Sequence, residues 1–188
     1  MLIQRSDYYG IGQIANHCDL QKLEIATNEA EDFDLEGLFC DFWEEIKAHF
    51  SDDPLADPWK TLIDGGKFES CNDKSRTLKG IKKIIAYYGY ARYIILNSFN
   101  DTPNGNVSKT NDFSIPKPLK ELEFVADKYR SMGFAEFKKT MAYLCLNKDL
   151  FEGFESNECK PCGCNGMCGN KTKAKGYGIR GRNVSKQL

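Results

Sequence analysis

The sequence predicts a mainly α-helical protein, a small helical bundle with one short β-hairpin, a long extended loop and an irregular, cysteine-rich C-terminal tail. Apolar residues recur at steps of three and four in several segments, which is the period of an amphipathic helix. Hydrophobic residues make up 41% and charged residues 28% of the 188 residues, a composition typical of globular proteins. We expect one compact domain over residues 1–154 and a tail over residues 155–188.

The first helices are predicted between residues 20 and 50. Residues 20–30 place small and apolar side chains on one side of a helix, and residues 35–50 repeat the helical spacing. The second helix should end near Ser51, because the sequence Asp-Asp-Pro follows it. Acidic residues and Gly37 could break the two helices apart.

A short segment and a hairpin should follow. The sequence WKTLIDGG at 59–66 predicts a single helical turn that the two glycines stop. The sequence KFESCNDKSRTL at 67–78 has Asn72 and Asp73 between two short arms, which favours a small β-hairpin.

The clearest helix lies between residues 78 and 99, where apolar residues keep the three-and-four spacing and tyrosines widen the apolar face. This helix is too apolar to face water on all sides. It therefore either runs through the middle of a bundle or turns its tyrosines toward a neighbouring subunit, where aromatic residues with a polar tip are favoured. On the second interpretation Tyr90 and Tyr93 are interface candidates.

Residues 100–118 contain three prolines, a glycine and many Asn, Ser, Thr and Asp residues. We expect a long exposed loop or arm there, with Phe113 as a further interface anchor. The last strong helix should run from Pro118 to Asn147, and Gly133 could bend or interrupt it. Unbroken, it would be about 45 Å long at the usual helical rise.

Charge is divided unevenly along the chain. Residues 159–188 carry seven Lys or Arg and no acidic residue, which gives +7. The first 158 residues hold the other 19 basic and all 27 acidic groups, which gives −8. The basic tail could follow a nucleic-acid backbone, but a solvated or partner-docking tail is the favoured interpretation because its charge is moderate.

Eight cysteines fall into two sets. Cys159, Cys162, Cys164 and Cys168 lie within ten residues and could close around one tetrahedral zinc ion. This run is denser than the separated pairs of most structural zinc sites, so a flexible thiol-rich tail is the alternative. The other four lie among apolar residues and are predicted to be free thiols, as expected in a reducing cytoplasm: Cys18, Cys40, Cys71 and Cys145.

Catalysis, secretion and membrane insertion find little support in the sequence. Only His17 and His49 are available, far apart and without a metal-ligand partner at helical spacing. The chain has no GxSxG turn, and GMCGNKT lacks the glycine spacing of a phosphate loop. No basic leader and no apolar run of about 18 residues occurs. We expect a soluble, intracellular protein that is not an enzyme and has no contact with membranes.

The order of segments over residues 57–147 resembles a known family. DPWKTLIDGGKF is followed by LKGIKKIIAYYGYARYI, by the T-x-x-G-x-V of DTPNGNV and by a helix containing KYRSMGF. This order is similar to that of head–tail connector (adaptor or ring) proteins of tailed phages that infect Bacteroidetes, including the crAss-like group. The cysteine-rich tail departs from the family's pattern.

The resemblance implies a virion structural protein that forms a ring of twelve copies beneath the portal. Such a subunit would contact itself, the portal and neighbouring tail or ring proteins. It would line part of the DNA channel without reading the DNA sequence, and it would need no cofactor. It would be made and assembled in the host cytoplasm and then reside at the head–tail junction of the virion.

Two functions therefore stand as the leading hypotheses, and a small enzyme whose site is not recognisable in the sequence is a third option. The first is a connector subunit that uses Tyr90, Tyr93 and Phe113 at its interface and whose acidic residues keep the DNA channel from gripping phosphate. The second is a zinc-stabilised, nucleic-acid-binding regulatory protein in which the four clustered cysteines order the basic tail.

Overall fold

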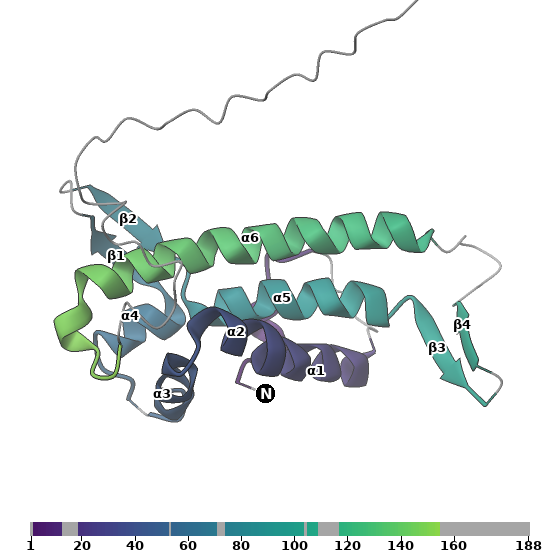
Figure 1. Cartoon of the computed structure of the whole chain (residues 1–188), viewed down its shortest axis with the longest axis horizontal. Helices are drawn as coiled ribbons and strands as arrows, with labels where there is room; N and C mark the ends of the chain where they lie inside the picture. Colours follow the sequence, from purple (N-terminus) through teal and green to yellow (C-terminus); the bar gives the residue numbers. More distant parts are fainter. Residues whose placement is uncertain are drawn as a thin grey trace, which may run out of the picture.

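The computed structural model describes residues 2–12, 19–52, 54–70, 74–103, 105–108 and 117–154. The predicted fold class is confirmed, because this part of the chain is mainly helical and contains a small antiparallel hairpin. Helix α5 (Ile81–Leu96) runs through the middle, with α6 (Leu119–Leu146) along one side and α1 (Leu20–Glu29) along the other (Figure 1). The apolar helix is thus the centre of the bundle, the first of the two arrangements that its composition predicted.

The N-terminal third forms the side of the bundle opposite α6. A 3-10 turn, η1 (Arg5–Tyr8), precedes α1, which continues through a π-helical stretch, η2 (Ala30–Leu35), into α2 (Glu36–Phe39). The break that we expected between residues 30 and 37 is therefore absent from the described chain. It lies instead at Cys40, whose φ of 53° is incompatible with an α-helix, so that α3 (Phe42–His49) starts anew.

The predicted short helix and hairpin are both confirmed. Helix α4 (Trp59–Asp64) is followed by β1 (Gly66–Glu69) and β2 (Ser75–Leu78), which pair antiparallel with Phe68 opposite Arg76. Phe68 and Leu78 are buried in the main core and fasten the hairpin to the bundle. The hairpin lies beside the C-terminal part of α6 (Figure 1).

Helix α6 is continuous over its 28 residues, a length of about 42 Å. Gly133 does not break it. Its missing side chain instead lets α6 approach α5 closely, since a Cβ there would lie 2.7 Å from a ring carbon of Tyr88. Beyond α6, the turn η3 (Lys148–Leu150) brings Phe151 and Phe154 against Phe42 and closes that end of the core.

The extended loop predicted over residues 100–118 needs correction at its start. Strands β3 (Phe99–Thr102) and β4 (Gly105–Ser108) form a second antiparallel hairpin between α5 and α6. Residues 109–116 and the predicted tail, 155–188, lie outside the described residues. Within the described chain, no helix is both long enough and apolar enough to cross a lipid bilayer.

Candidate interaction surfaces

The hairpin β3–β4 projects from the end of the bundle where α5 stops and α6 begins (Figure 1). Its base is tied to α1 by Lys22, whose ammonium group donates to the carbonyls of Leu96 and Phe99 and to the side-chain oxygen of Asn100. The two strands pack mainly against each other, and they form a sheet of their own. Each strand therefore keeps one edge of backbone amides and carbonyls unpaired by another strand of the described chain.

An isolated two-stranded hairpin is at best marginally stable in water, so a projecting one gains from a partner. The side chain of Val107, on β4, is 47% exposed. Several other apolar side chains are exposed on helices that start at or run toward this end of the bundle: Leu20 on α1, and Leu119 and Phe124 on α6. Open strand edges next to exposed apolar groups are typical of a surface that pairs with another chain.

The tyrosines predicted as interface anchors lie mostly inside the subunit. Tyr93 is only 6% exposed, and it stacks on Tyr90 at a ring distance of 6.2 Å. Tyr90 is partly buried and meets the ring of Tyr129 on α6 edge-on at 4.8 Å. Burial raises the pKa of Tyr90. Within the subunit, Tyr90 thus contacts both α5 and α6, and the interface role of Tyr90 and Tyr93 stays a prediction. Phe113 lies outside the described residues.

A strongly acidic surface covers the side of the bundle formed by α1, η2, α2 and α3. Residues 19–57 contain 13 Asp or Glu and 2 Lys, which gives a net charge of −11. Arg92 reaches across from α5 and pairs with Asp34 at 2.6 Å and with Glu29 at 3.1 Å. We call the exposed carboxylates of this side the acidic face: Glu24, Asp32, Glu36, Asp41, Glu44 and Glu45.

An ionic cluster around the buried Glu136 joins α6 to the start of α5. Glu136 is 6% exposed, accepts a hydrogen bond from Lys139 at 2.8 Å and lies 3.7 Å from the ammonium group of Lys79. Lys79 also donates to the hydroxyl of Tyr87 at 3.3 Å, which raises the pKa of Lys79. The buried carboxylate of Glu136 thus lies between two lysines, a geometry that suits holding the two helices in register.

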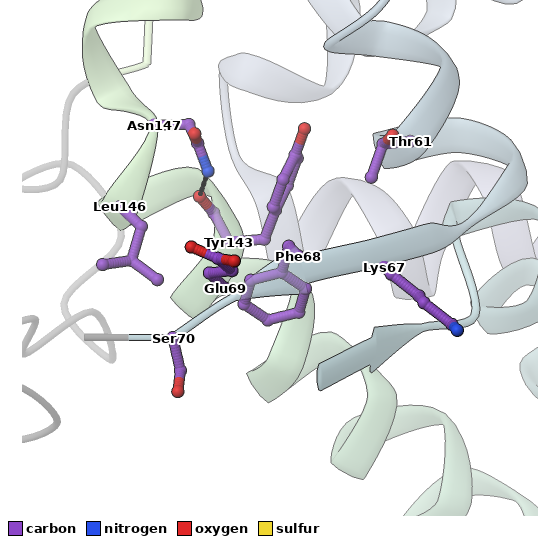
Figure 2. Close-up of a pocket in the computed structure, with 8 residues that line it drawn as sticks. All are labelled: Thr61, Lys67, Phe68, Glu69, Ser70, Tyr143, Leu146 and Asn147. Carbon is purple, nitrogen blue, oxygen red and sulfur yellow. Dashed lines mark hydrogen bonds between the residues drawn. The ribbon is translucent and has the colours of Figure 1, made fainter. Parts of the chain in front are cut away.

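A cavity of about 380 Å³ lies between β1, α4 and the end of α6. Figure 2 shows Phe68 and Tyr143 at its wall, with Asn147 donating a hydrogen bond to the carbonyl of Tyr143 at 2.9 Å. The Tyr143 hydroxyl donates to the carbonyl of Pro58 at 3.3 Å, and burial raises the pKa of this phenol. The hydroxyl is therefore committed to the fold.

Some of the predicted cysteine roles concern described residues and others do not. The proposed zinc ligands Cys159, Cys162, Cys164 and Cys168 lie outside the described residues, so the zinc site stays a prediction. Among the described residues, no group of three or more His, Cys, Asp or Glu side chains is placed to hold a metal ion.

Of the cysteines predicted as free thiols, Cys40 is free and partly buried. Cys145 is disulfide-bonded, so that prediction is wrong at this position. Cys18 and Cys71 lie outside the described residues. The ring of His49 stacks on Trp59 at 3.8 Å, and its Nδ1 lies 2.6 Å from Asp52, so this histidine is held by local contacts.

Comparison with known proteins matches much of the chain to a family model. A model of a family of unknown function, DUF6712, matches residues 44–163, which is 120 of the 188 residues. The match runs from α3 through both hairpins and α6, and it leaves out α1, η2 and α2. Neither the curated proteins nor the solved structures contain a match.

Proposed function

The chain belongs to DUF6712, a family of unknown function, and we propose that it is a virion structural protein, a head–tail connector subunit that assembles into a ring. The observation that carries this proposal is the projecting hairpin β3–β4 with its open strand edges and exposed Val107. The resemblance of residues 57–147 to phage connectors supplies the kind of assembly, a ring of twelve beneath the portal.

A closed ring requires a heterologous contact, in which one patch of a subunit binds a different patch of the next. The hairpin suits such a contact, because it extends beyond the bundle and can add its edge or its apolar residues to a neighbour. The partners in this proposal are further copies of the chain, the portal protein, and the neighbouring ring or tail proteins.

The proposal also gives a role to the charge of the body. DNA must slide through a connector without being held, and a net charge of −8 over the first 158 residues disfavours contact with phosphate. In this proposal the protein contacts its neighbours and lets DNA pass through the ring, and it needs neither catalysis nor a cofactor. Its place would be the head–tail junction of the virion.

We test the proposal with the mass of the full chain under native conditions, alone and mixed with a portal protein from the same phage genome. The expected result is a closed multimer in at least one of the two samples. Replacement of Val107 by Lys should abolish the multimer, because it puts a charge at the proposed contact without touching the core.

Replacement of Thr77 by Lys is the matched control, since Thr77 is an exposed residue on the other hairpin. This variant should assemble like the unmodified chain. Single chains in both samples would overturn the proposal. A monomer or dimer that retains zinc and binds DNA would instead support the zinc-stabilised regulatory protein.

A further inference from the structure

The acidic face lacks enough cations of its own to neutralise it. Of the two lysines within residues 19–57, Lys47 pairs with Glu44 at 2.5 Å and Lys22 is turned toward the carbonyls at the end of α5. Arg92 neutralises part of the charge through Glu29 and Asp34. A surplus of exposed carboxylates is left along α1, η2, α2 and α3, and such a surplus attracts a basic partner.

An aromatic side chain stands among these carboxylates. Phe33, on η2, is 69% exposed and lies between Asp32 and Asp34 in the chain. The guanidinium group of Arg92 lies 5.7 Å from the centre of its ring. An exposed ring surrounded by charge has the arrangement of a small interface, an apolar centre inside a charged rim that fixes the partner's position.

The chain leaves the described body close to this surface. Phe154 is its last residue, and its ring lies 5.1 Å from the ring of Phe42, the first residue of α3. Asp41 precedes Phe42, and Glu45 lies one turn further along the helix. The 34 residues that follow Phe154 can span roughly 110 Å, far more than the roughly 30 Å length of the continuous stretch α1–η2–α2.

The segment that follows Phe154 has the positive charge that the acidic face lacks. Residues 159–188 carry +7 and no acidic residue. They also include Tyr177, Ile179, Arg180 and Arg182, and arginine and aromatic side chains are the groups that pack on an exposed phenyl ring. Both the charge and the apolar centre of the acidic face therefore find a complement within the same chain.

From the surplus charge, the exposed ring and the exit point, we propose that the basic segment 159–188 docks on the acidic face of its own chain. Tethering favours the intrachain contact, because a short linker raises the effective concentration of the segment to the millimolar range. The docked segment would cover Phe33 and reduce the charge of this side. This inference goes beyond the connector proposal and places the tail, not the DNA, against this face.

The test is zero-length coupling of lysines to carboxylates in the full chain under reducing conditions. An equal mixture of isotopically heavy and light chains separates couplings within one chain from couplings between chains. The expected result is intrachain coupling of Lys171, Lys173 or Lys175 to carboxylates of the acidic face. This coupling should fall by about tenfold or more in 1 M salt, where the screening length shrinks to about 3 Å.

A pair of charge variants gives the control. The double change Asp32→Asn and Glu36→Gln should weaken coupling of the tail lysines to Glu24 and Asp41, which are left intact. The double change Glu123→Gln and Asp149→Asn removes the same charge from exposed sites outside the acidic face and should leave that coupling unchanged.

Three outcomes would overturn the inference. One is heavy–light couplings as frequent as the heavy–heavy and light–light couplings together, the statistical result of coupling between chains, which would place the segment on another copy. The second is coupling spread over carboxylates such as Glu123 as readily as over the acidic face. The third is coupling that salt does not reduce. Ring formation is measured separately by native mass, so failure of this inference and failure of the connector proposal are distinguished.

Discussion

At the scale of single residues, Tyr8 joins three parts of the bundle. Its buried hydroxyl lies 2.5 Å from the hydroxyl of Thr27 on α1, and the Thr27 hydroxyl donates to the carbonyl of Leu23 at 2.6 Å. Gly89 on α5 leaves room for the phenol, since a Cβ at that position would lie 2.4 Å from the Tyr8 oxygen. Burial raises the pKa of Tyr8 from 10.0 to about 12.

Replacement of Tyr8 by Phe should lower the free energy of unfolding by about 1 kcal/mol at neutral pH, the usual contribution of one buried hydrogen bond. The difference should shrink between pH 10 and 12, because tyrosine then ionises in the unfolded chain before it does in the folded one. This ionisation draws the unmodified protein toward unfolding, and the Phe variant does not undergo it.

Urea unfolding of both proteins at neutral pH and between pH 10 and 12 measures the difference. A gap that stays constant or widens at alkaline pH would contradict the buried, neutral phenol. The variant should keep its fold, because Thr27 retains its bond to Leu23.

At the scale of elements, the contact between α5 and α6 depends on Gly133. A Cβ at this position would lie 2.7 Å from a ring carbon of Tyr88 and 3.3 Å from the Cβ of Tyr87. Both tyrosines are buried, so neither ring is free to move into solvent. The glycine therefore sets how closely the two longest helices of the described chain approach each other.

Replacement of Gly133 by Ala should destabilise the protein, although alanine favours a helix over glycine by about 1 kcal/mol. Overpacking a close helix contact costs about 1–3 kcal/mol and outweighs that gain. Gly37→Ala on α2 is the control, since nothing lies within 4 Å of the added Cβ; it should be neutral or stabilising by up to about 1 kcal/mol. Thermal unfolding measures the stability of both variants. Equal stabilisation of the two would contradict the close contact at Gly133.

Most elements were predicted from the helical spacing of apolar residues and from the turn residues. The spacing of apolar residues located α5 and α6, and the Asn-Asp turn located β1–β2, because these patterns are local and strong. The hairpin β3–β4 was missed, since Phe99 and Val107 are its main apolar residues and alternation is weak. The Asn-Gly pair at 104–105 is a known hairpin signal and could have revealed it.

The candidate surfaces were harder to predict for a different reason. A tyrosine-rich helix face looks the same in sequence whether it packs against its own bundle or against a neighbour. Tyr93 is buried because α6 and α1 flank α5, and that packing is a property of the tertiary fold. The break at Cys40 was also hidden, since a positive φ at a residue other than glycine has no sequence pattern of its own.

At the scale of the whole molecule, three asymmetries fit a subunit that joins others. The hairpin β3–β4 extends from one end (Figure 1), the exposed carboxylates of the acidic face lie on one side, and the basic segment follows the body in sequence. Two different surfaces on one molecule can form a heterologous contact, which closes into a ring when the rotation between neighbours divides a full turn. The central claim is that copies of this chain meet through the hairpin in such a ring.

Cryo-electron microscopy of the full chain, mixed with a portal protein from the same phage genome, tests that claim most directly. The account predicts closed rings, twelve subunits if the resemblance to phage connectors holds, in which β3–β4 of each subunit lies against the next. Single chains that neither form rings nor bind the portal, or rings in which every β3–β4 hairpin points into solvent, would contradict it.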